Sequence, residues 1–170
     1  MTNNTWKYTV LQPGDLPKKA QRFIEMMGVD MSDITLMKLT PCPDGKFIKC
    51  FDNGELRKSN RPLAAIAEFN GIYFFSNNVP VGTAIHELTH IYLSQSKYMK
   101  GYEYDLQGMG ERFIKQNGVS ALSYYAQVSI YENAWEEVIC EIVAAYGRRG
   151  QFNKIEEMFN QLPTIKKGGI

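Results

Sequence analysis

Both histidines of the chain lie in one pentapeptide, His86-Glu87-Leu88-Thr89-His90. This H-E-x-x-H pattern constrains the fold strongly, because residues four apart on a helix lie one turn above each other and can bind one metal ion through their rings. Glu87 follows round the same face and could reach a water molecule at that ion. In zinc sites with this pattern the ion makes water more acidic and the glutamate acts as a general base. The pattern therefore indicates hydrolysis.

The residues around this motif favour a partly buried helix over a helix face exposed to water. A strand-like run, GIYFFS at residues 71–76, comes shortly before it, and Pro80 suits the first turn of a helix because no backbone donor is needed there. The segment also has an apolar face, formed by Ile85, Leu88, Ile91 and Tyr92. We therefore predict a helix from about residue 80 to residue 96 that presents both histidines to a metal site.

A catalytic zinc ion generally takes three protein ligands, and the chain has no third histidine. The helix predicted over residues 132–146 offers Glu137, Cys140 and Glu141 on a stripe beside its apolar face. Acidic groups against apolar surface are costly unless a cation compensates them. One glutamate could ligate the ion while the other, one turn away, accepts a hydrogen bond from a ligand histidine. Two alternatives stay open: Cys140 is the ligand, or the glutamates of this helix simply face water. Those glutamates are Glu132, Glu136, Glu137 and Glu141.

The segment HELTH at residues 86–90, followed by EEVICEIVAA at residues 136–145, resembles the gluzincins, the zinc metallopeptidases that combine H-E-x-x-H with a downstream glutamate. The second segment is similar to the metallopeptidase domains of antirestriction and polyvalent proteins of phages and mobile elements. It is more distantly similar to lethal-factor-like peptidases. The resemblance covers about residues 63–147, and it implies a phage or mobile-element setting.

The resemblance implies a Zn²⁺ ion bound by His86, His90 and Glu137, with Glu141 holding a ligand histidine, although the two glutamates could exchange roles. It implies a zinc metallopeptidase that cleaves a peptide or protein substrate, with Glu87 as general base. The alternative from another class is a zincin-fold binding or antirestriction module that keeps the zinc but acts by occluding a partner. An intact Glu87 favours the enzyme, because a purely structural zinc has no use for a base beside it.

Gluzincins also often supply a tyrosine or histidine that stabilises the oxyanion formed when water attacks the peptide carbonyl. Because no further histidine is present, a tyrosine would have to serve in this chain. Tyr131 is the first candidate, since lethal-factor-like proteins carry theirs close to this position. Tyr124 and Tyr125 are the alternatives.

The pattern of apolar residues predicts a single domain of the α+β class over residues 1–170, and the resemblance implies that this domain is zincin-like. Strands are expected within about residues 5–76 and helices within about residues 80–162, giving a small twisted, mostly antiparallel sheet, an active-site helix and a helical C-terminal half. The individual strands are expected at 6–11, 34–39 and 46–51, and a helix capped by Asp15 is expected to end at Gly28.

A hairpin and a substrate edge are also expected. Asn70-Gly71 between two apolar runs predicts a hairpin turn, whereas residues 57–62 are polar and predict a loop. In zinc peptidases the strand at the place of residues 72–76 commonly forms the sheet edge on which an extended substrate lies. The alternative is a plain buried strand, which the aromatic residues Tyr73, Phe74 and Phe75 fit equally well.

Composition limits the other function classes. The formal net charge is +1, from 19 basic and 18 acidic residues, so neither nucleic acid nor an anionic membrane is predicted as a partner. Three cysteines without a disulfide spacing favour reduced thiols. The start of the chain lacks the pattern of a secretory signal, and no apolar run is long enough to span a bilayer. We therefore expect a cytoplasmic protein.

Overall fold

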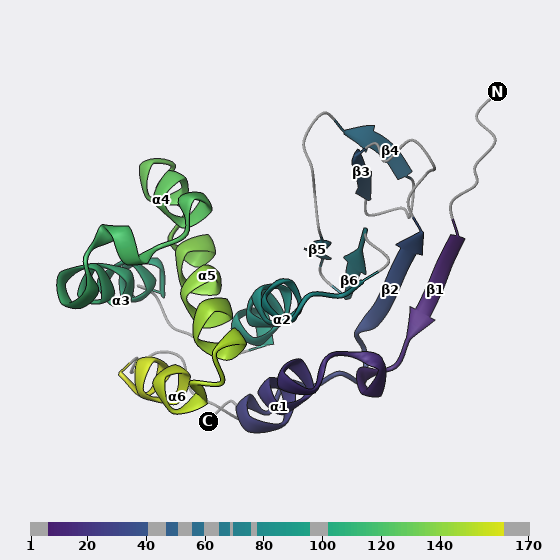
Figure 1. The fold of residues 1–170 in the computed structure, drawn as a ribbon, viewed down its shortest axis with the longest axis horizontal. Helices are drawn as coiled ribbons and strands as arrows, with labels where there is room; N and C mark the ends of the chain where they lie inside the picture. Colours follow the sequence, from purple (N-terminus) through teal and green to yellow (C-terminus); the bar gives the residue numbers. More distant parts are fainter. Residues whose placement is uncertain are drawn as a thin grey trace.

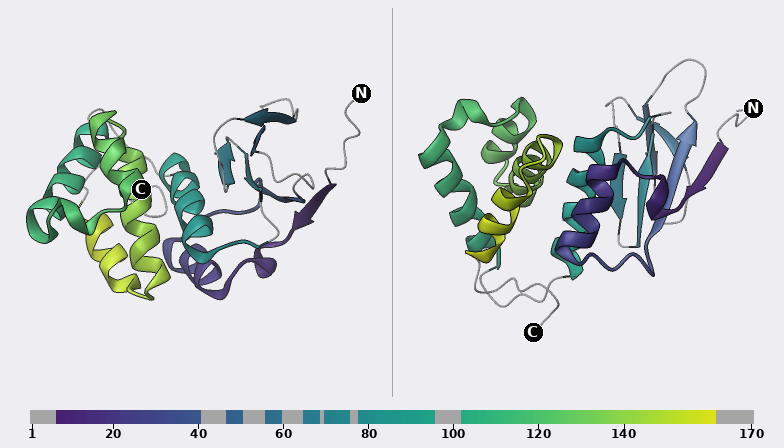
Figure 2. Two further views of the ribbon diagram at one scale, coloured as in Figure 1. Left: turned by 45° about the horizontal axis from the view of Figure 1, so that its top comes forward. Right: turned by 60° about the horizontal axis from the view of Figure 1, so that its bottom comes forward.

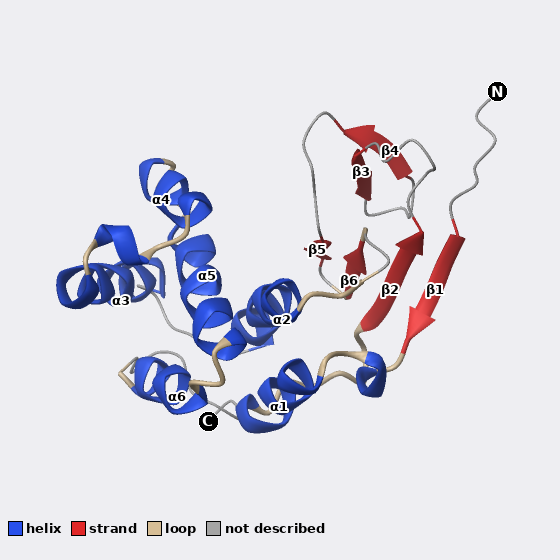
Figure 3. Cartoon of the chain, viewed as in Figure 1, coloured by secondary structure: helices blue, strands red, loops and turns tan. Residues whose placement is uncertain are grey.

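The computed structural model describes residues 7–40, 47–50, 56–59, 65–68, 70–75, 78–95 and 102–161. Two small sheets gather on one side of the molecule and the C-terminal helices on the other (Figure 1). Figure 3 makes the division plain, since the strands come from the N-terminal half and most helices from the C-terminal half. The structure confirms the predicted α+β class.

The main sheet is mixed and has the strand order β1-β2-β6-β5. Its strands are β1 (Lys7–Leu11), β2 (Thr35–Thr40), β5 (Ala65–Glu68) and β6 (Gly71–Phe74). The pairs β1–β2 and β5–β6 are antiparallel, whereas β2–β6 is parallel, so the sheet is mostly antiparallel as predicted.

The prediction that residues 72–76 form the edge of the sheet is wrong for β6. This strand is hydrogen-bonded on both sides, and its Ile72 and Phe74 side chains are buried. A continuous apolar run is typical of an interior strand, because both of its faces are covered. Within the described part of the sheet, β5 is the strand at this edge instead.

The predicted hairpin between β5 and β6 is confirmed, although its turn differs from the expected Asn-Gly pair. Glu68 pairs with Gly71, so Gly71 already belongs to β6 and is not a turn residue. A side chain at Gly71 would bring its Cβ to 3.1 Å from the Thr35 carbonyl oxygen. Glycine therefore favours close strand packing at this position and does not serve a left-handed turn.

A second, two-stranded sheet contains β3 (Phe47–Cys50) and β4 (Leu56–Ser59), paired antiparallel. The strand β3 was predicted, but residues 57–59 were expected in a loop. The β4 sequence, LRKS, has no apolar alternation, so its strand conformation depends on the hydrogen-bond ladder with β3 and not on a local signal. Residues 60–62 of the predicted loop lie outside the described residues.

Helix α1 (Lys18–Met27) follows β1 and ends, as predicted, at Gly28, which has a φ of 69°. The predicted cap is wrong, because Asp15 belongs to a separate short 3₁₀ turn, Pro13–Asp15. The Asp15 carboxylate accepts a hydrogen bond of 2.8 Å from the Gln12 backbone N–H. It therefore stabilises that turn, and α1 begins only after Pro17.

The remaining helices are α2 (Val81–Gln95), α3 (Tyr102–Asn117), α4 (Tyr124–Tyr131), α5 (Trp135–Arg148) and α6 (Phe152–Asn160). In Figure 2, α1 and α2 lie between the main sheet and the C-terminal helices. This middle position explains why α2 is so apolar. Buried residues of the sheet and of both helix layers form one hydrophobic core. Among the helices described, none is both long enough and apolar enough to cross a membrane.

A short connection separates α4 from α5. Ser123 caps α4 by accepting a hydrogen bond from the Ala126 N–H, so α4 begins at Tyr124. Asn133, with a φ of 56°, separates α4 from α5. Glu132 consequently lies before α5 and does not share a helix with Glu137.

Candidate metal centre

The two helices that carry the predicted motifs pack against each other in opposite directions. Glu136, near the start of α5, contacts His90, whereas Glu141, one turn further on, contacts His86. Gly147, at the end of α5, lies against Ile85, so the backbones of the two helices approach closely there. This arrangement brings together residues 46 to 55 positions apart in the sequence.

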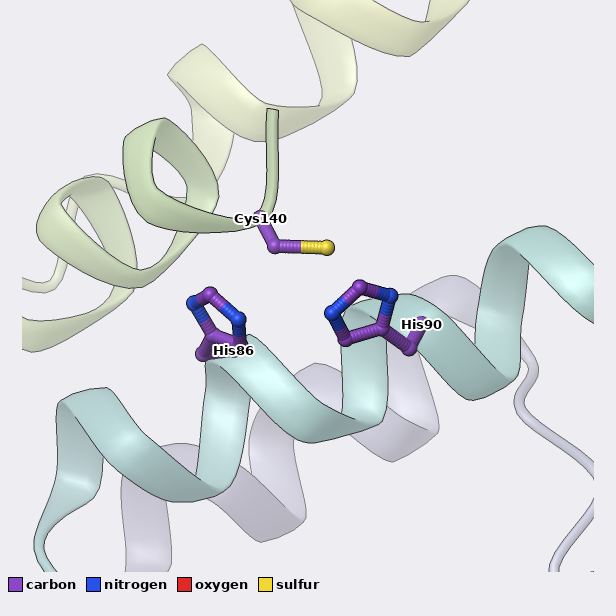
Figure 4. A group of neighbouring side chains, drawn as sticks. All are labelled: His86, His90 and Cys140. Atoms are coloured by element: carbon purple, nitrogen blue, oxygen red, sulfur yellow. The ribbon is translucent and has the colours of Figure 1, made fainter. Parts of the chain in front are cut away.

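Figure 4 shows His86 and His90 projecting from α2 toward Cys140 on α5. One ligand atom from each of these three residues lies within 4.8 Å of the others. The structure therefore contains a group of imidazole and thiol side chains that is able to hold a metal ion.

Glu137 contacts both histidines, each through a different carboxylate oxygen. Its Oε2 lies 3.0 Å from Nε2 of His86, and its Oε1 lies 3.1 Å from Nε2 of His90. The outer ring nitrogens contact two further carboxylates: Nδ1 of His86 is 2.7 Å from Glu141 and Nδ1 of His90 is 3.1 Å from Glu136. Each imidazole is thus fixed from both sides, with its Nε2 atom turned toward Glu137.

Two residues from α4 and its cap complete the surroundings of these carboxylates. Ser123 donates a hydrogen bond of 2.7 Å from its hydroxyl to Glu141. The Tyr125 hydroxyl hydrogen-bonds with Glu137, and its ring centroid lies 6.2 Å from that of His86. Burial, together with the charge of Glu137, raises the pKa of Tyr125 to about 12. Tyr125 is therefore a neutral hydrogen-bond donor at neutral pH.

The electrostatics of the site favour a positive charge between its carboxylates. Burial by itself would lower the pKa of His86, but the hydrogen bonds that its ring donates to Glu137 and Glu141 outweigh burial and raise the pKa to about 9. The pKa of His90 is raised in the same sense, because Cys140, Glu136 and Glu137 outweigh its burial. Burial would raise the pKa of Glu137, yet the two histidines hold it well below its usual range.

Glu87 projects from α2 toward β5, at the edge of the main sheet. It is 8% exposed, and its carboxylate accepts a hydrogen bond from the Ala67 backbone N–H of β5. Burial raises the pKa of Glu87, while the charges of the two histidines act in the opposite sense. A buried carboxylate with a raised pKa beside a metal-binding group is well suited to accept and release protons.

Two cavities meet at these residues. The larger has a volume of about 750 Å³ and is bordered by Ser123, Glu141 and the ends of α2 and α5. The smaller has a volume of about 380 Å³ and follows β5 past His90 and Glu137. Both are lined by Ala65, His86, Glu87 and Tyr125. The potential metal-binding and proton-transfer groups are therefore open to a ligand from two sides.

The structure brings five of the six predicted site residues together: His86, Glu87, His90, Glu137 and Glu141. It does not bring Tyr131 there, because this residue is 90% exposed at the end of α4. Tyr124 is also largely exposed, whereas Tyr125, named as an alternative, contacts the site.

Sequence reasoning missed the contacts of Glu136 and Ser123. Glu136 directly precedes Glu137 and was available from the motif, since adjacent helical residues can reach two histidines that are one turn apart. Ser123 carried no such signal, because its contact with Glu141 depends on how α4 packs against α5.

Comparison of the chain with protein-family models, with curated proteins and with solved structures found no match.

Proposed function

We propose that this chain is a zinc-dependent peptidase in which His86, His90 and Glu137 hold the ion and Glu87 is the general base. The observation that carries the proposal is the position of Glu137. Its carboxylate oxygens lie 3.0 and 3.1 Å from the two inward-facing Nε2 atoms, while other carboxylates contact the outer Nδ1 atoms. An arrangement in which carboxylates fix the outer nitrogens of metal-binding histidines is usual in zinc sites.

The spacing and chemistry of these donors fit zinc. Ligands that are each about 2.0–2.1 Å from one ion in tetrahedral geometry lie roughly 3.3 Å apart, close to the separations between Glu137 and the two Nε2 atoms. Imidazole nitrogen and carboxylate oxygen are the donors of catalytic zinc sites. The raised pKa values of both histidines also support the binding of a cation, because they show that the surrounding carboxylates stabilise positive charge.

Glu137 is favoured over Cys140 as the third ligand. The histidines keep Glu137 ionised, and its side chain is 30% exposed beside the cavities. Cys140 is fully buried, and this burial raises the pKa of its thiol to about 12, so it would have to lose a proton in apolar surroundings. Binding an ion therefore costs less free energy with the Glu137 carboxylate as ligand than with the Cys140 thiol.

A bound zinc ion supplies Lewis-acid chemistry, since it polarises a carbonyl group and makes water more acidic. Glu87 would take a proton from the attacking water and pass it to the amine that leaves. Its position at the meeting point of the cavities suits both transfers, and the Ala67 N–H fixes its orientation. The Tyr125 hydroxyl, and not that of Tyr131, is the candidate to stabilise the oxyanion.

The substrate would lie along β5. Residues Ala65 to Ala67 line the smaller cavity together with Glu87 and His90, and no described strand pairs with the outer side of β5. An extended peptide could therefore hydrogen-bond to this strand and cross the site.

The test combines zinc analysis with cleavage of a peptide library by the wild type and by the Glu87→Gln, Glu137→Gln and Cys140→Ser variants. We expect one zinc per chain in the wild type and in Glu87→Gln, with cleavage lost in Glu87→Gln. Glu137→Gln should lose zinc, whereas Cys140→Ser should keep it. Retention of zinc by Glu137→Gln and its loss from Cys140→Ser would assign the third ligand to the thiol. Zinc without any cleavage would instead support a binding module.

A further inference from the structure

The larger cavity extends from the metal centre to a basic end formed by Arg148 and Arg149. Because α2 and α5 run in opposite directions, this end lies beside the first turn of α2, beyond His86. Its remaining walls are mostly apolar and include Phe113, Ile142, Ala145 and Tyr146. The cavity therefore joins the proposed catalytic groups to two guanidinium groups.

Arg148 lies directly against α2. Its Nη1 atom is 3.5 Å and its Cδ atom 3.9 Å from the point that a Cβ on Gly82 would occupy. The bare backbone at Gly82 thus makes room for this side chain next to the cavity. Among the described residues, none forms an ion pair with Arg148 or Arg149. A guanidinium presents a planar set of donors that matches a carboxylate.

The distance from the metal centre to this arginine corresponds to about two substrate residues. Gly82 precedes His86 by four positions on α2, which is roughly 6 Å along the helix axis. An extended peptide advances about 3.3 Å per residue. A peptide cleaved at the metal centre would therefore bring a group two residues away close to Arg148.

The direction of the peptide follows from β5. Ala65, at the start of this strand, lines the larger cavity, whereas Ile66 and Ala67 line only the smaller one with His90. A peptide that pairs antiparallel with β5 would run from the smaller cavity into the larger one. Its residues on the C-terminal side of the cleaved bond would then approach Arg148.

We infer that Arg148, assisted by Arg149, selects substrates that carry a carboxylate about two residues C-terminal to the cleaved bond. This inference rests on the proposed peptidase function. The carboxylate could belong to an acidic side chain or to the end of the substrate chain, and both would be bound by the same guanidinium donors.

The experiment compares two matched peptide pairs, built around a bond that the library identifies as cleaved. The first pair has Glu or Gln at the second position after the bond, with an amidated C-terminus. The second pair ends at that position with a free or an amidated carboxyl group. We expect the wild type to favour the charged member of at least one pair by roughly tenfold or more in kcat/KM. The responding pair identifies the source of the carboxylate.

Arg148→Gln should reduce this preference at least severalfold, and Arg148→Glu should favour a peptide with Lys at the same position. Arg112→Gln, on an exposed face of α3 that borders neither cavity, is the matched control and should leave the preference unchanged. Circular dichroism and zinc content verify that each variant is folded. Cleavage without a preference for the charged member, or a preference that survives both Arg148 variants, would overturn the inference while leaving the peptidase proposal intact.

Binding of the same peptides to Glu87→Gln separates the two proposals further, because it needs no cleavage. A preference for the charged member that disappears when Arg148→Gln is added supports the inference independently of the cleavage rates. Equal binding of both members of each pair would contradict it.

Discussion

Glu141 shows how single residues fix the proposed metal ligands. Its carboxylate bridges Nδ1 of His86, at 2.7 Å, and the hydroxyl of Ser123, also at 2.7 Å. It therefore holds the imidazole in one orientation without occupying the inward-facing Nε2 atom. Such a contact tunes the affinity of a metal site but does not create the site, because the ligand itself remains.

We predict that Glu141→Ala lowers zinc affinity by about 10- to 100-fold while one zinc per chain still binds at saturation. Competition with a chromophoric chelator would measure the affinity. Glu132→Ala is the matched control, since Glu132 is an exposed glutamate outside α5 and should have no effect. Complete loss of zinc from Glu141→Ala would instead make Glu141 the third ligand.

The sequence predicted the residues of the site better than their partners. The four-residue spacing of His86 and His90 implies a shared helix face, and this needs no knowledge of the rest of the fold. The tyrosine that contacts the site was harder to predict, because Tyr125 and Tyr131 lie six residues apart and so face different directions on α4. Only the packing of α4 against α5 decides which of them reaches the site.

At the scale of helices, the site depends on the close approach of α2 and α5. Gly147 is buried, and a Cβ at this position would overlap the Ile85 side chain. Because both helices carry proposed ligand residues, this contact sets the distance between the histidines and Glu137. The sequence suggested Gly147 as the end of the helix, but the structure has it within α5 as a packing residue.

We predict that Gly147→Ala destabilises the protein by about 1–3 kcal/mol, because the added methyl group must displace Ile85 or separate the helices. Gly108→Ala provides the control, since a Cβ there meets only Arg112, with Nη1 at 3.8 Å. That substitution should stabilise α3 by up to about 1 kcal/mol. Chemical denaturation of the two variants measures both effects, and equal stabilisation by both would contradict the proposed packing constraint.

The helices and the hairpin were predicted because each has a local signal, such as apolar periodicity or a glycine at the end. The position of β6 inside the sheet was not predicted. It depends on the parallel pairing of β6 with β2, whose residues lie more than thirty positions earlier. The same limit explains β4, whose polar sequence becomes a strand through its partner. Elements held by distant contacts were therefore the ones that sequence reasoning missed.

For the molecule as a whole, the proposed metal centre connects layers that are formed by different parts of the chain. The histidines belong to the middle layer, and Glu137 belongs to the C-terminal helices, about fifty residues later. An ion held by both would bind the folded state and not the unfolded chain, so it would couple metal binding to global stability.

We predict that zinc raises the midpoint of thermal unfolding, by an amount set by the free ion concentration. At 100 times the dissociation constant the stabilisation is about 2.7 kcal/mol. For a chain of this size each kcal/mol corresponds to roughly 2–4 °C, so the midpoint should rise by about 5–11 °C. Scanning calorimetry with buffered zinc and with EDTA would measure the shift.

Glu137→Gln should abolish this shift, whereas Arg112→Gln should retain it, because only the first substitution removes a donor that joins the two layers. A shift of equal size in Glu137→Gln would mean that the stabilising ion binds elsewhere.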